Sequence, residues 1–481
     1  VDEVYELFMD LNATDKQLDF PILYGIARQG IVVKDPKEVQ QIQVQQGDFK
    51  LQKSPKGGNG LNINPLFETI IEHVDAYPNL NDEPLQMQVS SLAYDDYIGR
   101  LGIGRITKGI LKSGQTVAVA KATGGIVQRK INQVFVYRGL KRVPVEQAEC
   151  GDIVVVCGIS DIFIGETICD PQNPEPMEMI HIEDPTLSMN FIVNKSPFAG
   201  QAGKFVTSRH IKERLEKELE VNVGLIVEQA ATTDEFKVSG RGELHLSVLI
   251  ENMRREGYEL AVSKPEVIMH KDEKGRKLEP IEEVILSVPD EYAGSVISKL
   301  NIRKGVMREM SGENGYSKMV YLVPTRGLLG YRSEFINDTH GEGTMVRRFY
   351  SYEEFKGEIP QRTNGVAIAQ EAGTCTGYAL YNIQERVQLF VEPGVKVYEG
   401  MIVGVNSRND DMVVNPCKAK KATNMRAAGS DDAIKLSPIR VFTLEEALEF
   451  INSDELVEVV PGDIRLRKKL LGELERRRSG R

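Results

Sequence analysis

The hydrophobic pattern of the first 80 residues predicts helices, one strand and a polar insertion. Apolar residues recur at helical spacing within residues 1–18 and again within 65–74, and a short apolar strand is expected at 20–24. Residues 33–62 are rich in Gln, Lys and Gly, which is typical of a flexible surface insertion. One strand is too few to close an α/β sheet, so residues 1–80 are interpreted as the C-terminal remnant of a larger α/β domain.

A different pattern covers residues 84–181. Short segments of alternating apolar and polar residues are separated by turns at glycines, including Gly109 and Gly114. Strands that repeat about every 8–12 residues are typical of a small antiparallel β-barrel. This region is therefore expected to be an all-β barrel domain.

The segment 184–263 predicts the order strand, helix, strand, strand, helix, strand. Thr207 is suited to cap the first helix, and Gly257 ends the second. This is the element order of a ferredoxin-like sandwich. Residues 264–358 repeat the order, with a helix stop at Gly305, although the two segments hardly match in sequence. We expect two ferredoxin-like units that pack separately.

Residues 359–481 are expected to form a mostly β C-terminal domain. A Lys-rich loop at 407–428 follows its strands, and a capping box at Thr443 and Glu446 predicts one helix. The expected fold class is therefore multidomain, with an α/β remnant followed by all-β and α+β domains. The strands predicted in the last domain are 366–370, 377–383, 386–391 and 401–407.

The composition restricts the class of protein. Apolar residues make up 41% of the 481 residues and charged residues 27%, the balance of an ordinary folded protein. No apolar run approaches the roughly 18 residues of a membrane helix, and the first residues show no signal peptide. Five cysteines without a CxxC pair indicate a reduced chain, and six scattered histidines predict no metal site.

Positive charge is concentrated in two segments, although the whole chain carries a net charge of −10. Residues 464–481 hold eight Lys or Arg against two Glu, a local charge of +6. Residues 408–426 hold five Lys or Arg against two Asp, a local charge of +3, with Asn and Thr residues between them. Cations mixed with amide donors suit irregular RNA, where phosphates and base edges both need donors.

From the residues alone, both basic segments have two interpretations. Each can bind RNA phosphates, and each can equally be a solvated surface, a tail in one case and a hairpin loop in the other. The loop 407–428 contains no aromatic residue, so base stacking is not expected to be its mode of binding.

The sequence contains no recognisable set of catalytic residues. The phosphate-binding pattern GxxxxGK[ST] is absent, as are GxSxG and SxxK. Asp96–Gly99 satisfies DxxG and Asn194-Lys195 begins an NKxD, but both lie outside any nucleotide-binding pattern and are interpreted as coincidences. We therefore expect no catalytic residue in this chain, which disfavours an enzyme of another class.

Several long stretches resemble translational GTPases of the elongation factor G class. Residues 99–117 resemble the β-barrel of these factors, GRGELHLSVLIENMRREGYELAVSKPEVI at 240–268 resembles their third domain, and 288–305 and 323–335 resemble their fifth domain. The C-terminal stretch 362–436 resembles specifically the BipA/TypA family of ribosome-associated translational GTPases.

This resemblance implies a translation-factor β-barrel, two ferredoxin-like sandwiches and a BipA-type C-terminal domain. It implies a monomeric GTP-binding factor that binds the ribosome near the A site and contacts rRNA and the acceptor end of tRNA through its C-terminal domain. The family is linked to assembly of the large (50S) subunit and to stress responses, in the bacterial cytoplasm or in plastids. The alternative is a protein-interaction scaffold without direct RNA contact.

GTP and Mg²⁺ belong to the full-length family, whereas no cofactor is expected in this chain. The P-loop, switch and NKxD motifs would precede residue 1, so the chain alone is expected to be inactive as a GTPase. Gly25 stands where the family has the Ser of a guanine-contacting turn, which leaves Gly25 and Ala27 as a weak remnant of that site. The residues expected to contact RNA are Arg326, Arg332, Arg408, Lys418, Lys420, Lys421, Asn424, Arg426, Arg465, Arg467, Lys468 and Lys469.

Overall fold

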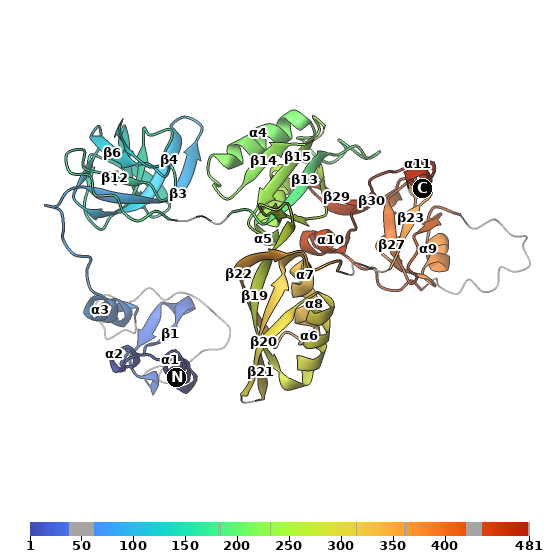
Figure 1. Cartoon of the computed structure of the whole chain (residues 1–481), viewed down its shortest axis with the longest axis horizontal. Coiled ribbons are helices and arrows are strands. Elements are labelled where there is room, and N and C mark those ends of the chain that lie inside the picture. The colour runs from blue at the N-terminus through green and yellow to red at the C-terminus, as the bar shows by residue number, and fades with distance from the viewer. Residues whose placement is uncertain are drawn as a thin grey trace, which may run out of the picture.

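The structure is a computed structural model of the whole chain. It describes all residues except 38–61, 181, 183, 231, 314, 360–361, 363, 420–434 and 480–481. Figure 1 shows the N-terminal elements, a β-barrel, two α+β units and a C-terminal body along the chain. None of the helices in the described ranges is long and apolar enough to cross a membrane.

The N-terminal elements match most of the predicted pattern. Both stretches with helical spacing are confirmed as helices, whereas the strand lies later than expected, at β1, where it pairs with β2 around a short 3-10 turn, η1. Most of the predicted insertion lies outside the described residues. The elements are α1 (Asp2–Asp10), α2 (Asp15–Leu18), β1 (Tyr24–Ile26), η1 (Ala27–Gln29), β2 (Ile31–Val33) and α3 (Asn64–His73).

The barrel is an eight-stranded antiparallel sheet with the strand order β7-β6-β12-β3-β4-β11-β8-β9. Its main core includes Met87, Ile106 and Val154, and a smaller apolar cluster includes Leu101 and Val155. The strands are β3 (Gln86–Asp95), β4 (Gly99–Lys108), β6 (Thr116–Ala120), β7 (Ile126–Lys130), β8 (Gln133–Arg138), β9 (Lys141–Val145), β11 (Ile153–Cys157) and β12 (Thr167–Cys169), with a separate pair, β5 (Leu111–Lys112) and β10 (Gln147–Ala148).

The first α+β unit follows the barrel and has the predicted order of elements. The Thr207 side chain accepts a hydrogen bond from the His210 amide and caps α4, and Gly257 ends α5 with a φ of 98°. The strands run in the order β14-β15-β13-β16. The elements are β13 (Leu187–Val193), α4 (Ser208–Leu219), β14 (Ile226–Gln229), β15 (Glu235–Gly240), α5 (Glu243–Glu256), β16 (Leu260–Ser263) and β17 (Glu266–Val267).

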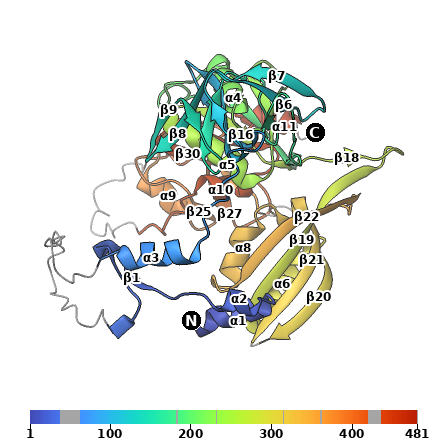
Figure 2. The same cartoon turned by 90° about the vertical axis from the view of Figure 1, so that its left-hand side faces the viewer.

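The second α+β unit has its own sheet. Strand β19 lies between β21 and β22, and β20 pairs with β21, which repeats the strand order of the first unit. Figure 2 shows β18 and the start of β19 extending away from the rest of this unit. The elements are β18 (His270–Lys271), β19 (Lys277–Pro289), α6 (Asp290–Ile302), β20 (Val306–Glu313), β21 (Tyr316–Pro324), α7 (Thr325–Leu328), α8 (Tyr331–Asp338) and β22 (Thr344–Glu354).

The end of the chain completes the sheet of the first α+β unit. Strand β29 (Glu455–Val460) pairs with β16, and β30 (Asp463–Lys468) pairs with β29. The helix predicted by the capping box is confirmed as α10 (Leu444–Phe450), and its apolar residues share a core with α5. The interpretation of the basic end as a solvated tail is wrong for residues 464–468, because β29 extends the free edge of β16 and β30 then pairs with β29.

The C-terminal body contains the remaining strands and the short helices α9 and α11. Its sheet has the order β25-β27-β23-β28, in which β23 and β28 are parallel. The strand predicted at 377–383 is wrong, because these residues form helix α9, whose N-cap Thr376 accepts a hydrogen bond from the Ala379 amide. The elements are β23 (Val366–Ala369), β24 (Gly373–Thr374), α9 (Gly377–Ile383), β25 (Val387–Leu389), β26 (Lys396–Val397), β27 (Ile402–Asn406), β28 (Met412–Val414) and α11 (Glu473–Ser479).

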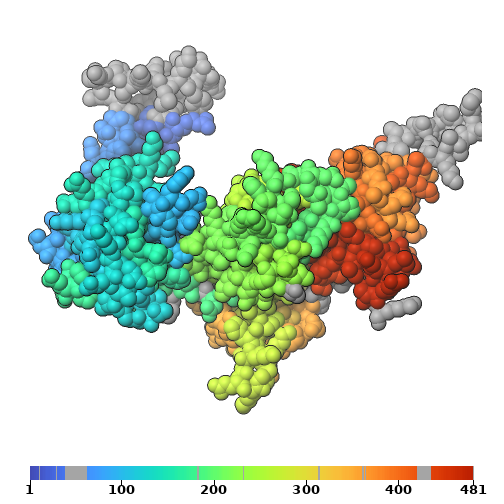
Figure 3. Space-filling view, turned by 90° about the horizontal axis from the view of Figure 1, so that it is seen from above, coloured from blue at the N-terminus to red at the C-terminus, as the bar shows by residue number. Residues whose placement is uncertain are grey.

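The barrel, the first α+β unit and the C-terminal body lie in a row (Figure 3). The Arg100 guanidinium lies 2.7 Å from the Glu220 carboxylate, and Lys217 lies 2.8 Å from Asp96, so ion pairs join the barrel to the first unit. On the other side, Glu458 of β29 accepts hydrogen bonds from Asn194 at 2.7 Å and from Tyr398 of the C-terminal body at 2.5 Å.

One half-buried carboxyl group lies where three parts of the chain meet. Glu243 begins α5 and is close to Gly330 and Arg347 of the second unit and to Glu449 of α10. Burial raises the pKa of Glu243 to about 7, and the nearby carboxylate of Glu449 adds to the effect. The group is therefore largely protonated below neutral pH.

Candidate RNA-binding surface

The residues expected to contact RNA fall into an exposed set and a buried set. Arg332, Arg408, Lys418 and Lys469 are exposed. Arg467 and Lys468 are buried, while Arg326 and Arg465 are partly buried. Lys420, Lys421, Asn424 and Arg426 lie outside the described residues.

The turn after β27 presents Arg408 on a fixed backbone. The Asn406 side chain donates a hydrogen bond to the Asp410 carbonyl at 2.7 Å, and the Gly365 amide donates one to the Arg408 carbonyl at 2.9 Å. A side chain at Gly365 would place its Cβ 2.1 Å from the Asp410 carbonyl oxygen, so this close approach requires glycine. The Arg408 side chain therefore projects into solvent from a backbone that its neighbours hold in place.

Helix α9 anchors the chain just before and just after residues 420–434. The Thr376 hydroxyl donates a hydrogen bond to the Lys418 carbonyl at 2.7 Å. At the other end of the helix, the Gln384 side chain donates to the Lys435 carbonyl at 3.1 Å and accepts from the Ser437 amide at 2.9 Å. Thr376 and Gln384 flank the seven residues of α9, so their backbone positions are roughly 12 Å apart along the helix.

Cations surround both ends of α9. Lys418 is next to the N-terminal anchor, Arg386 follows the C-terminal end, and Lys435 occupies the second anchor; all three side chains are exposed. Neither they nor Arg408 forms an ion pair with any residue that the structure describes. The acids nearest to these cations in the sequence have other partners or stay in solvent. Asp411 pairs with Lys468 at 2.6 Å, Glu371 accepts a hydrogen bond from Asn415 at 2.6 Å, and Asp410 and Glu385 are exposed. The surface can therefore attract phosphate groups.

Two tyrosines on α9 belong to this surface, and the sequence reasoning missed them. Tyr378 and Tyr381 are exposed on a helix whose Ala379 and Leu380 are buried. Residues three apart lie on opposite faces of a strand but on the same side of a helix. The wrong prediction of a strand at 377–383 therefore separated two rings that the structure brings together. A hydroxyl N-cap at Thr376 was the signal that could have identified the helix.

The basic residues of β30 form ion pairs inside the molecule. The Lys468 ammonium lies 2.6 Å from Asp411, 2.7 Å from Asp454 and 3.0 Å from Glu455. Burial alone would lower the pKa of Lys468, but the surrounding carboxylates outweigh it and raise the pKa.

The two arginines of β30 are also turned inward. Arg465 pairs with Asp463 at 2.8 Å and with the buried Glu458 at 3.2 Å, and Arg467 is only 4% exposed. Arg465 and Lys468 therefore pair with acids of the C-terminal region, and Arg467 is buried beside them, so these side chains cannot reach RNA without leaving their present positions. Lys469 is exposed.

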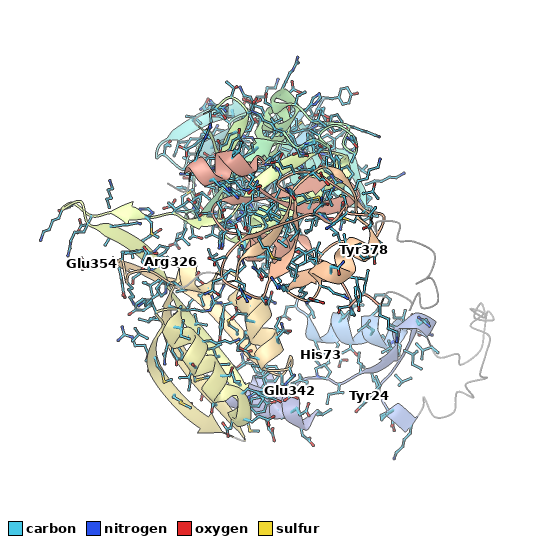
Figure 4. All side chains as sticks on the ribbon, turned by 90° about the vertical axis from the view of Figure 1, so that its right-hand side faces the viewer. Tyr24, His73, Arg326, Glu342, Glu354 and Tyr378 are labelled. Atoms are coloured by element: carbon cyan, nitrogen blue, oxygen red, sulfur yellow. The ribbon has the colours of Figure 1, made fainter. Side chains whose placement is uncertain are left out.

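Arg326 also has a position inside the molecule, whereas Arg332 is exposed on α8. The Arg326 guanidinium bonds the fully buried Glu279 at 2.5 Å, donates to the Gly357 carbonyl, and lies 4.4 Å from the centre of the Phe355 ring (Figure 4). Removing this arginine would leave Glu279 as an uncompensated buried charge. Arg326 therefore ties the β22 end of the second unit to α7.

The two residues of the weak nucleotide remnant lie in the N-terminal elements. Gly25 lies in β1, and Ala27 begins η1. Within the part of the chain that the structure describes, no three His, Cys, Asp or Glu side chains gather in a way that could hold a metal ion.

Comparison with known proteins places the domains in a family. Residues 99–169 match elongation factor Tu domain 2, residues 276–363 match the elongation factor G C-terminus, and residues 364–473 match the TypA/BipA C-terminal domain. Over the whole chain, a protein of Bacillus subtilis (strain 168) named large ribosomal subunit assembly factor BipA is 45% identical, with 76% of that protein covered. The chain belongs to the BipA family.

Other members of the family show the same relationship. The factor of that name from Haemophilus influenzae is 47% identical over the whole chain, with 75% of it covered, and the one from Escherichia coli (strain K12) is 46% identical, with 76% covered. A crystal structure of a protein from Thermus thermophilus aligns with a TM-score of 0.41 at 18% identity, over 61% of this chain and 59% of that chain, a likeness too weak to bear on the fold. The family matches confirm three of the expected translation-factor domains, namely the barrel, the second α+β unit and the C-terminal domain, whereas residues 184–263 lie outside all three matches.

Proposed function

We propose that this chain is the C-terminal portion of a GTP-dependent factor that binds the ribosome and acts in assembly of the large subunit. The observation that carries the proposal is the name shared by relatives about 46% identical over the whole chain, which are large ribosomal subunit assembly factors. The proposed place of action is the bacterial cytoplasm or a plastid, with a role under stress.

The C-terminal body is the proposed site of contact with rRNA and with tRNA near the ribosomal A site. The exposed cations Arg408 and Lys418 support this role, since both lack carboxylate partners among the described residues. Lys420, Lys421, Asn424 and Arg426 follow directly in the sequence and add cations and an amide donor. Phosphate contacts of this kind give affinity that is largely independent of sequence.

The GTP and Mg²⁺ of the full-length family are proposed to bind outside this chain. Its sequence has no GxxxxGK[ST] pattern, and without such a cradle neither Mg²⁺ nor the γ-phosphate can be positioned. We expect no heat of tight binding when a non-hydrolysable GTP analogue is titrated into the chain. Tight binding would contradict the proposal.

Ribosome co-sedimentation at rising salt tests the RNA contact. The variant Lys418→Ala/Lys420→Ala/Lys421→Ala should sediment less with ribosomes, and its binding should fall less steeply with salt, by about one unit of slope for each phosphate that is no longer bound. The matched control Lys130→Ala/Arg138→Ala/Lys141→Ala removes the same charge from exposed positions of the barrel. If both triple variants bind like the unmodified chain, the three lysines do not bind RNA and their proposed role is wrong.

A further inference from the structure

Tyr378 and Tyr381 are two exposed aromatic rings on one side of α9. Tyr378 is 37% exposed and Tyr381 47% exposed, and their spacing of three residues places them on neighbouring turns of the helix. Neither ring stacks on another aromatic ring, and neither hydroxyl forms a hydrogen bond, with any residue that the structure describes. Figure 4 locates Tyr378 at the edge of the C-terminal body.

The helix that carries the rings is held firmly. Thr376 caps it, the Thr376 amide donates to the Pro416 carbonyl at 3.0 Å, and the side chains of Ala379 and Leu380 are buried beneath it. A rigid helix with tyrosines, which have few rotatable bonds, loses little entropy when a partner binds. These rings are therefore preorganised for a flat partner.

The positive charge around the two tyrosine rings favours a negatively charged partner. Exposed cations lie at both ends of α9, Lys418 at the N-terminal anchor and Arg386 and Lys435 at the C-terminal end, and one exposed acid, Glu385, follows the helix. Aromatic rings between cations combine the two features that bind single-stranded nucleic acid. We infer that Tyr378 and Tyr381 form a base-stacking platform for unpaired nucleotides of RNA, an inference that rests on the proposed RNA contact of the C-terminal body.

The stacking requirement distinguishes unpaired from paired RNA. In a duplex, each base face is covered by its neighbours, and proteins read mainly phosphates and 2′-hydroxyl groups. An unpaired nucleotide exposes its base face, which a tyrosine ring can cover while a nearby lysine or arginine binds its phosphate. The cations can bind phosphates of both paired and unpaired RNA, whereas the tyrosines add affinity only for unpaired RNA.

The test uses the full chain and an RNA single strand of roughly ten nucleotides that carries 2-aminopurine, whose fluorescence falls when the base stacks. The variant Tyr378→Leu/Tyr381→Leu keeps apolar bulk without a ring, and Tyr378→Phe/Tyr381→Phe keeps the ring. The control Tyr137→Leu removes an equally exposed tyrosine from the barrel strand β8.

We expect the leucine variant to bind the single strand about tenfold more weakly, with loss of the fluorescence decrease, and to bind the matching duplex with unchanged affinity. The phenylalanine variant and Tyr137→Leu should behave like the unmodified chain. Binding of the unmodified chain without any fluorescence decrease would overturn the inference even if the leucine variant fails to fold.

Two further results separate this inference from the proposed function. If the leucine variant binds the single strand normally while the triple lysine variant binds it weakly, the stacking platform is wrong and the RNA contact stands. If the leucine variant loses ribosome binding but keeps its affinity for the single strand, α9 binds a protein and the inference is also wrong.

Discussion

The cations around α9 and those of β30 look alike in sequence but differ in surroundings. Both lie in Lys- and Arg-rich stretches of a chain whose net charge is −10. Lys418 is exposed without an ion pair among the described residues, whereas Lys468 is 3% exposed and has three carboxylates within 3.0 Å. A run of basic residues therefore indicates an RNA-binding surface only where the fold does not pair these residues with carboxylates of the same chain.

The largest effect is expected from removing a buried cation. Lys468→Ala would remove the shared partner of Asp411, Asp454 and the buried Glu455, which would keep only its ion pair with Arg362 among the described residues. We expect the free energy of unfolding of β29 and β30 to fall by about 3–5 kcal/mol. Hydrogen exchange at the amides of these strands measures this change directly.

The neighbouring residue provides the matched control for this prediction. Lys469→Ala removes an exposed cation of the same strand end and should change the same free energy by less than about 0.5 kcal/mol. Equal effects of the two substitutions would show that the buried ion pairs do not stabilise the end of the chain.

A buried charge without adequate partners should have the opposite effect. The pKa of Glu243 is raised from 4.5 to about 7, so the unfolded chain releases this proton at lower pH than the folded chain does. Stability from this group is fully present below about pH 4.5 and falls as the pH rises to about 7. We expect Glu243→Gln to raise the free energy of unfolding by about 3 kcal/mol at pH 8 and to leave it unchanged at pH 4.

Denaturant unfolding of both proteins at several pH values tests this prediction. The difference between Glu243→Gln and the unmodified chain should grow between about pH 4.5 and 7 and then remain constant. A constant difference from pH 4 to pH 8 would mean that Glu243 has the same pKa in the folded and the unfolded chain, which would contradict the prediction.

The smallest effect on stability is expected at the exposed cations. Arg408→Ala and Lys418→Ala remove side chains that make no ion pair with a described residue, so each should change the free energy of unfolding by less than about 0.5 kcal/mol. Thermal melting of each variant beside Lys468→Ala checks the contrast. Destabilisation of Arg408→Ala or Lys418→Ala by several kcal/mol would mean that these cations have structural partners.

Local signals in the sequence identified several elements correctly. The cap at Thr207, the stop at Gly257 and the capping box at Thr443 each determine a helix end through contacts between near neighbours in the chain. The prediction at 377–383 is wrong because a short run of apolar and aromatic residues fits both a strand and a helix. The N-cap hydrogen bond of Thr376 favours the helix that the structure shows.

The features that define the candidate site depend on contacts distant in sequence. Strand β29 pairs with β16 almost 200 residues earlier, and Lys468 meets Asp411 from another part of the fold. The local spacing of hydrophobic residues indicates neither contact, so the sequence could not predict that the basic residues of β30 are buried. For the same reason, the sequence did not show that α9 contacts the chain at both Lys418 and Lys435.

The most direct test of the contrast between the two groups of cations is the salt dependence of RNA binding by two variants. Arg408→Ala/Lys418→Ala removes exposed cations, and Arg465→Ala removes a paired one. In the double variant, the slope of log affinity against log salt for rRNA or tRNA should fall by about one unit for each phosphate that is no longer bound. The same slope should stay unchanged for Arg465→Ala, provided that binding is measured below the melting temperature of this variant. An unchanged slope for the double variant, with a reduced slope for Arg465→Ala, would contradict the account.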